Sequence, residues 1–308
     1  MDLTTLKEME PWEWPENACD LLLAIALDRH ADESDRLLAT QLAGDYSVVN
    51  DQIVEALLSL LHDSEESEEL RGKAAISLGP VLEQCDTDGF DDPDDMLINE
   101  FTFHKTCESL RKLFSDTDVP KVVRRRILEA AVRAPQDWHR EAVQVAHSSD
   151  DPEWNLTAVF AMRWIDGFDD EIIDALESED EDLRYEAVCA AGSWELDAAW
   201  PYVADLVESS DTDKDMLLAA IEAAANIRPE EAGATLAHLL ESDDEEIVEA
   251  VHDAVGLADM MSDPDFECDD DSDDEDEFDD DDDLEGDSEG DSEGDDDAGE
   301  EQDDSPER

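Results

Sequence analysis

The sequence predicts an all-α protein, an α-solenoid of stacked helix pairs with about 31 residues per unit, followed by a disordered acidic C-terminal tail. Three observations predict it: a short acidic turn that recurs at a nearly constant interval, apolar residues at helical spacing after each turn, and a C-terminal segment almost without apolar residues. One helix pair of this length cannot cover its own apolar face, so neighbouring pairs must stack around a shared core.

The internal period is set by an acidic turn that follows a short apolar segment, as in Leu113-Phe-Ser-Asp-Thr-Asp and Leu240-Glu-Ser-Asp-Asp-Glu. The first serines of its five copies fall at residues 115, 148, 178, 209 and 242, so the steps are 33, 30, 31 and 33 residues. Five copies in such regular register indicate a repeat architecture.

After each acidic turn comes an Ala-rich amphipathic helix, which we call the first helix of the unit. Its apolar residues recur at i, i+4 and i+7 or i+8, the spacing of a helix buried along one stripe. The stripes are Leu183, Ala187, Val188, Ala191 and Trp194, then Leu217, Ile221, Ala224 and Ala225, then Ile247, Val251, Ala254 and Val255. Ser, Asp and Glu before each helix are suited to cap its free N–H groups and to favour its dipole.

A shorter second helix closes each unit before the next turn. Its stripes are Ile172, Ile173 and Leu176, then Val203, Leu206 and Val207, then Leu236, Leu239 and Leu240. Short breaks such as Ala134-Pro135, Asp166-Gly167 and Arg228-Pro229 separate it from the first helix. One unit is therefore a helix–turn–helix.

These units resemble HEAT repeats, in particular the short HEAT-like class named after phycobilisome lyases. The resemblance is carried best by Leu176-Glu-Ser-Glu-Asp-Glu-Asp-Leu-Arg184-Tyr-Glu-Ala187-Val-Cys-Ala190-Ala191-Gly192, where an acidic turn precedes an arginine and spaced alanines. It covers residues 115–260 well and residues 33–82 more loosely. The resemblance implies fold rather than activity, because such repeats serve many functions.

The predicted organisation has two parts. Residues 1–262 form the solenoid, with irregular N-terminal units in 1–114, regular repeats in 115–262, and an acidic insertion at 83–100 that contains the loop Cys85–Asp95 and precedes a helix at about 100–114. Six or seven units are expected. Residues 263–308 contain 29 acidic residues and one basic residue, so burial cannot recover the entropy of ordering them, and we expect disorder.

The charge of the chain is strongly negative, with 93 acidic and 19 basic residues. Residues 1–262 alone carry 64 acidic and 18 basic ones. This balance disfavours direct contact with nucleic acid or an anionic membrane and favours a protein partner with a basic surface. Arg outnumbers Lys 13 to 6, which resembles the Lys-poor proteins of salt-in halophiles.

The N-terminal residues show no signal peptide, and the longest apolar run, Leu21–Leu27, is too short for a membrane span. The five cysteines, Cys19, Cys85, Cys107, Cys189 and Cys268, lack paired spacing. They predict reduced thiols in a cytoplasm. We also expect a monomer.

Two groups of residues are candidate partner contacts. The basic cluster contains Arg124, Arg125, Arg126, Arg133 and Arg140, together with Lys121. One interpretation is that it grips a phosphate, an acidic peptide or the protein's own tail, and the other is that acidic turns of neighbouring repeats neutralise it. The aromatic pair is Trp138 and Trp200, each at the start of a second helix, which the HEAT resemblance implies lines the concave face.

Other patterns favour structure over chemistry. Trp164 and Trp194 share one repeat position and predict core packing, whereas Asp86–Asp95 lacks the glycine and final acid of an EF-hand loop. His104 and Cys107, with Cys85 before them, offer too few ligands for a zinc site. No catalytic or nucleotide-binding motif is present, and no cofactor is expected.

The sequence therefore favours a non-enzymatic protein–protein interaction scaffold that binds through its concave face, with the acidic tail attracting basic partners. One alternative is a bilin-lyase-like enzyme or lyase subunit, which the repeat class alone implies. A second alternative is a nucleic-acid-associated HEAT protein of the DNA glycosylase kind, which the acidic charge of residues 1–262 disfavours.

Overall fold

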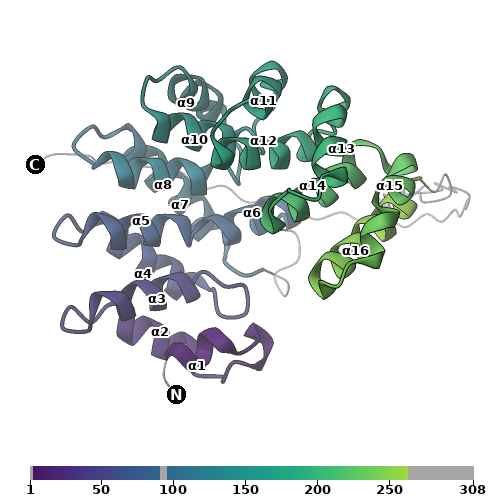
Figure 1. The fold of residues 1–308 in the computed structure, drawn as a ribbon. Helices are drawn as coiled ribbons and strands as arrows, with labels where there is room; N and C mark the ends of the chain where they lie inside the picture. Colours follow the sequence, from purple (N-terminus) through teal and green to yellow (C-terminus); the bar gives the residue numbers. More distant parts are fainter. Residues whose placement is uncertain (1–2, 91–95, 263–308) are drawn as a thin grey trace, which may run out of the picture. The chain divides into compact units, whose positions relative to one another are not determined.

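The computed structural model describes residues 3–90 and 96–262, and these residues form helices and turns without a β-strand (Figure 1). The predicted all-α solenoid of stacked helix pairs is confirmed. The predicted tail, residues 263–308, and residues 91–95 of the predicted insertion lie outside the described residues. The N-terminal helices are α1 (Leu3–Glu8), α2 (Ala18–Ala26), α3 (Glu33–Leu42), α4 (Asp51–His62), α5 (Glu68–Ile76), α6 (Gly79–Asp88), α7 (Glu100–Ser115) and α8 (Lys121–Ala131). The later helices are α9 (Asp137–His147), α10 (Pro152–Ala161), α11 (Asp169–Leu176), α12 (Glu181–Ser193), α13 (Trp200–Glu208), α14 (Lys214–Ile227), α15 (Pro229–Leu236) and α16 (Glu245–Ser262).

The helices form two layers. Helices α3, α5, α8, α10, α12, α14 and α16 pack side by side in chain order and make up the first-helix layer. Helices α2, α4, α7, α9, α11, α13 and α15 make up the second-helix layer, and each packs on the first helix that follows it. Within the described residues this gives seven antiparallel pairs, each closed by a short turn, with α1 and α6 in addition.

The acidic turns start the first helices by a repeated hydrogen-bond scheme. The hydroxyls of Ser178 and Ser242 accept the backbone N–H two residues on (3.1 and 3.2 Å) and shape the turn. An aspartate then caps the helix, as Asp180 does for α12 and Asp213 for α14, where it accepts the N–H of Met216 (3.1 Å). Side-chain oxygens at this position satisfy N–H groups that have no partner within the helix. The recurring Ser and Asp therefore have distinct roles.

Small residues set the spacing within the first-helix layer. A Cβ atom on Gly192 of α12 would lie 2.9 Å from the Cα and 3.1 Å from the Cβ of Ala223 on α14. Ala187, Ala191 and Ala220 are fully buried in the same layer. Helices can approach this closely only when the facing side chains are small. Small residues therefore allow α12 and α14 to pack closely side by side.

Helix α6 corrects the predicted insertion. Its residues continue as a helix to Asp88 and stop at Gly89, whose φ of +71° favours glycine. Residues 85–88 are therefore helical rather than part of the predicted loop Cys85–Asp95. Helix α6 packs on α8, and its Glu83 accepts hydrogen bonds from Trp164 Nε1 (3.0 Å) and from Arg133 (2.5 Å). The predicted helix at about 100–114 is present as α7.

Candidate functional site

A groove of about 900 Å³ lies on the first-helix layer, lined by residues of α12, α14 and α16 and by Arg163 after the end of α10. We call it the acidic groove. Each helix lines it with the residues that lie two, five and nine positions after the aspartate that precedes the helix. These aspartates are Asp180 for α12, Asp213 for α14 and Asp244 for α16. The lining residues are Asp182, Tyr185 and Cys189 of α12, Asp215, Leu218 and Glu222 of α14, and Glu246, Glu249 and Asp253 of α16. Positions i, i+3 and i+7 share one helical face, so the repeat itself builds the groove.

Carboxylates dominate the lining of the acidic groove. Eight lining residues are acidic and one, Arg163, is basic. Lys214, beside the groove, binds Glu246 and also Asp244 (2.7 Å), and Arg163 lies 3.8 Å from Glu222. Five of the lining carboxylates have no ion-pair partner within the described part of the chain: Asp182, Asp213, Asp215, Glu249 and Asp253. The groove therefore presents uncompensated negative charge.

Apolar side chains line the acidic groove between these carboxylates. Ala219 of α14 is buried, Ala250 of α16 is half-buried, and Leu257 at the far end of α16 is 45% exposed. Tyr185 is 37% exposed on the α12 side. Burial raises the pKa of Cys189 to about 11, so its thiol stays protonated at neutral pH. The groove thus combines apolar side chains with surrounding carboxylates.

None of the five arginines predicted to contact a partner lines the acidic groove, and each has an internal partner. Arg124 donates from Nε to the carbonyl of Phe114 (2.8 Å) and lies over the Phe114 ring. Arg125, 8% exposed, donates to Thr157 Oγ1 (2.9 Å), and Arg126 pairs with Glu129. Arg124 and Arg125 thus connect α8 with α7 and α10, whereas Arg126 pairs within α8.

The remaining two arginines are also occupied. Arg133 pairs with Glu83 and lies over the ring of Trp164 at 4.8 Å from its centroid. Arg140 pairs with Asp166 (2.6 Å), and its guanidinium nitrogens lie 2.8 Å from the position that a Cβ on Gly167 would take. That these arginines contact a partner stays a prediction.

The predicted aromatic contacts are half-buried and lie in the second-helix layer. Trp138 donates from Nε1 to Gln136 (3.0 Å) and packs on Phe114, with ring centroids 5.2 Å apart. Trp200 lies under the Arg228 guanidinium, 5.1 Å from the ring centroid. Neither lines the acidic groove. Their role as partner contacts also stays a prediction.

The other tryptophans differ from each other. Trp164 is half-buried and packs on the hydrophobic core, as predicted. Trp194, predicted to be core, is 37% exposed, because it follows the end of α12 and donates from Nε1 to the Met162 carbonyl (2.7 Å). The Trp194 indole therefore satisfies a carbonyl group at the C-terminal end of α10.

The thiols near α7 are buried. Burial raises the pKa of Cys107 to about 12 and also raises the pKa of Cys85. His104 is exposed and pairs with Glu100 at 3.5 Å. Across residues 3–90 and 96–262, no group of three or more His, Cys, Asp or Glu is placed to hold a metal ion, and no helix there is long and apolar enough to span a bilayer.

The groove carboxylates were not among the residues that the sequence singled out. A usable signal was present: acids recur at equivalent repeat positions, as at Asp182, Asp215 and Glu246. Such acids also occur on any solvated helix face. The spacing of the three helices is what makes them a site.

Comparison with known protein families identifies one segment of the chain. The family model for HEAT repeats matches residues 169–255. No curated protein matches the chain. Among solved structures, the chain is similar to Escherichia coli YibA at 16% identity, covering 80% of this chain and 84% of that one with a TM-score of 0.40. It is also similar to human deoxyhypusine hydroxylase in complex with glycerol (15% identity, 79% and 96% coverage, TM-score 0.37) and to an engineered protein (20%, 79% and 97%, 0.33). Residues 169–255 run from the start of α11 into α16, so the match to HEAT repeats covers α12, α14 and the first part of α16, which line the acidic groove.

Proposed function

We propose that the protein is a non-enzymatic scaffold that binds a partner protein with a basic surface through the acidic groove. The observation that carries this proposal is the repeated arrangement of carboxylates around apolar side chains on three adjacent helices. Apolar contact supplies affinity on desolvation, and the surrounding charges supply partner choice. A monomer in the cytoplasm is the simplest form of this scaffold.

Charge supports a basic protein partner over a nucleic acid. Phosphate backbones are bound by Lys and Arg that displace counterions, and the groove has the opposite sign. The 29 acidic residues within 263–308 add a long-range field that attracts basic partners and raises their association rate.

The state of the thiols supports binding over covalent chemistry. Attachment of a tetrapyrrole to an enzyme thiol requires a thiolate, whereas burial raises the pKa of Cys85, Cys107 and Cys189. Of these three, only Cys189 reaches the groove. A bilin-lyase-like reaction would therefore need a nucleophile other than these thiols.

The residues singled out by the sequence form a second proposed contact surface. Trp138 and Trp200 present partly exposed indoles on the second-helix layer, and Arg140 is 57% exposed. A partner there would compete with the internal contacts of these side chains. The acidic groove has unpaired charge and is the stronger site.

Affinity capture with the full-length protein tests the scaffold. Basic proteins should be retained at 0.1 M KCl and retained less at 1 M, and deletion of residues 263–308 should lower capture mainly at low salt. The matched control is an unrelated protein of similar negative charge. Retention of the same proteins by both baits would contradict the proposal, because bulk charge would then explain the binding.

A further inference from the structure

We infer that the acidic groove binds one face of a short basic amphipathic helix of the partner, with its cationic end at the N-termini of α12, α14 and α16. This inference rests on the proposed function and specifies the bound segment. It follows from three features of the groove: the order of charges along it, its length, and the hydrogen-bonding groups that it offers.

Carboxylates are denser at one end of the groove, where five of the eight lie, than further along it. Glu181, Asp182, Asp213, Asp215 and Glu246 lie at or just before the first turns of the three helices. Glu249 lies one turn further along, Glu222 and Asp253 lie level with Cys189, and beyond them the lining is Ala225 and Leu257. A ligand with most of its cations at one end and apolar side chains at the other would therefore match the groove better in one orientation than in the reverse.

The length of the groove fits a short helix. Asp215 and Ala225 line α14 ten residues apart, which corresponds to about 15 Å at a rise of ~1.5 Å per residue. A partner helix of about ten residues spans the same distance. Its diameter of about 10–12 Å with side chains leaves its outer half in solvent.

The chemistry of the lining favours a helix over an extended peptide. A helix satisfies its own backbone hydrogen bonds, whereas an extended segment needs donors for its carbonyl groups. The charged lining consists of eight carboxylates and Arg163, and carboxylates accept hydrogen bonds. The lining therefore suits Lys and Arg side chains better than an exposed peptide backbone.

Defined peptides test this inference on the full-length protein. The probe is a fluorescein-labelled, Ala-based 12-residue helix with three lysines in its first turns and leucines at i, i+4 and i+7 after them. Two comparison peptides are a scrambled sequence of the same composition and a version with Glu in place of Lys. Fluorescence anisotropy at 0.15 M KCl gives the affinities. The ordered Lys peptide should bind at least tenfold tighter than either comparison.

The groove variant is Asp213→Asn, Asp215→Asn and Glu249→Gln combined. Asn caps helices as well as Asp, so the cap on Met216 N–H is kept while the charge is removed. Affinity for the Lys peptide should fall about tenfold. The control variant, Glu141→Gln, Asp170→Asn and Glu208→Gln, removes the same charge from the exposed second-helix layer and should change affinity less than twofold.

A second variant, Ala250→Trp, places a bulky side chain in the groove and should weaken binding at both 0.15 and 1 M KCl, with circular dichroism confirming the fold. Equal weakening by the groove and control variants, or equal binding of the ordered and scrambled peptides, would overturn the inference. If full-length protein captures a basic protein and the groove variant captures it equally, the inference fails while the scaffold function stands.

Discussion

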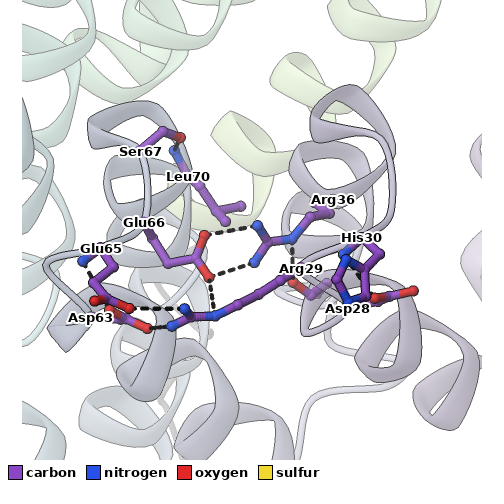
Figure 2. A network of polar contacts seen from close by, with 10 residues as sticks. Asp28, Arg29, His30, Arg36, Asp63, Glu65, Glu66, Ser67 and Leu70 are labelled. Atoms are coloured by element: carbon purple, nitrogen blue, oxygen red, sulfur yellow. Dashed lines mark hydrogen bonds and ion pairs between the residues drawn. The ribbon is translucent and has the colours of Figure 1, made fainter.

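Arg36 and Glu66 form a bidentate ion pair that joins two consecutive helix pairs (Figure 2). Both Glu66 oxygens accept hydrogen bonds from the Arg36 guanidinium at 2.8 Å, and the two side chains are only 9% and 8% exposed. The Nε of Arg36 also donates to the carbonyl of Ala26 at the end of α2 (3.0 Å). A single arginine thus fixes the end of α2, the start of α3 and the turn between α4 and α5.

The same arginine geometry recurs along the array. Arg71 donates from Nε to the carbonyl of Leu61 (2.9 Å), and Arg124 donates to that of Phe114 (2.8 Å), each ten residues earlier. A cation near the C-terminus of a helix satisfies free carbonyl groups and favours the helix dipole. These arginines therefore stabilise the ends of second helices.

The Arg36–Glu66 pair should contribute strongly to stability. Glu66→Gln leaves a buried guanidinium without its counter-charge, and breaking a buried pair costs about 3–5 kcal/mol. The control is Glu55→Gln, which breaks the exposed pair with Lys105 and should cost less than about 1 kcal/mol. Urea unfolding measures both free energies. Similar small losses would show that the pair at Glu66 is no stronger than a surface pair.

Close approach of α12 and α14 predicts opposite effects of two Gly→Ala changes. Gly192→Ala should destabilise by about 1–2 kcal/mol, because the new methyl group overlaps Ala223. Gly256→Ala, with no described atom within 4 Å of the added Cβ, should stabilise by up to about 1 kcal/mol through helix propensity. Chemical denaturation gives the signs. A gain at both positions would mean that the two helices separate readily.

Much of the fold follows from the repeat period. Ala187, Val188 and Ala191 are buried as their spacing predicts, since a 31-residue unit repeats one core pattern. Trp194 departs from the pattern because the helix ends at Ser193, and periodicity does not locate a helix end to one residue.

The sites depended on contacts that the sequence does not encode locally. Neutralisation of the basic cluster is one of the two interpretations that the sequence offers, but Glu83 meets Arg133 across 50 residues and Trp164 across 81, so this partner could not be predicted. Asp215 and Glu249 look like ordinary solvated residues until α14 and α16 are placed side by side.

His139 predicts a loss of stability in acid. It is 1% exposed, burial lowers its pKa to about 4, and its Nδ1 accepts the N–H of Gln136 (2.9 Å). The unfolded chain takes up this proton below about pH 6.5, so the stability present above that pH is lost as pH falls towards 4.

Protonation linked to His139 should lower the free energy of unfolding by on the order of 2 kcal/mol between pH 7 and pH 5. His139→Gln keeps an acceptor at this capping position and should reduce the dependence, as read from urea midpoints at the two pH values. The exposed His30→Gln should leave the profile unchanged. If the free energy of unfolding of His139→Gln changes between pH 7 and pH 5 as much as that of the wild type, protonation of His139 does not destabilise the fold.

Glu186 predicts the opposite trend. Burial, and then the neighbouring Glu129 carboxylate, raise its pKa to about 7 against the opposing effect of Arg163. The stabilisation that comes from protonated Glu186 is therefore fully present below about pH 4.5 and is lost as pH rises through 7, because the folded state must then hold a buried charge.

Glu186→Gln should raise the free energy of unfolding by about 1 kcal/mol at pH 8, or Tm by about 2–4 °C, and should have little effect at pH 4.5. The exposed Glu181→Gln on the same helix should change little at either pH, and an equal gain from it would assign the effect to general charge reduction.

Salt should stabilise the helical array, because its excess of carboxylates repels itself. Residues 1–262 hold 64 acidic and 18 basic residues, and the Debye length falls from ~10 Å at 0.1 M to ~3 Å at 1 M ionic strength. Screening also weakens attractive pairs, but exposed pairs such as Lys105–Glu55 contribute little, and the buried Arg36–Glu66 pair is screened less. The Tm should therefore rise between 0.1 and 1 M KCl. The variant Asp213→Asn, Asp215→Asn and Glu249→Gln should gain less from salt, because it removes three carboxylates that have no ion-pair partner among the described residues. A flat or falling Tm in the wild type would show that attractive pairs offset the repulsion.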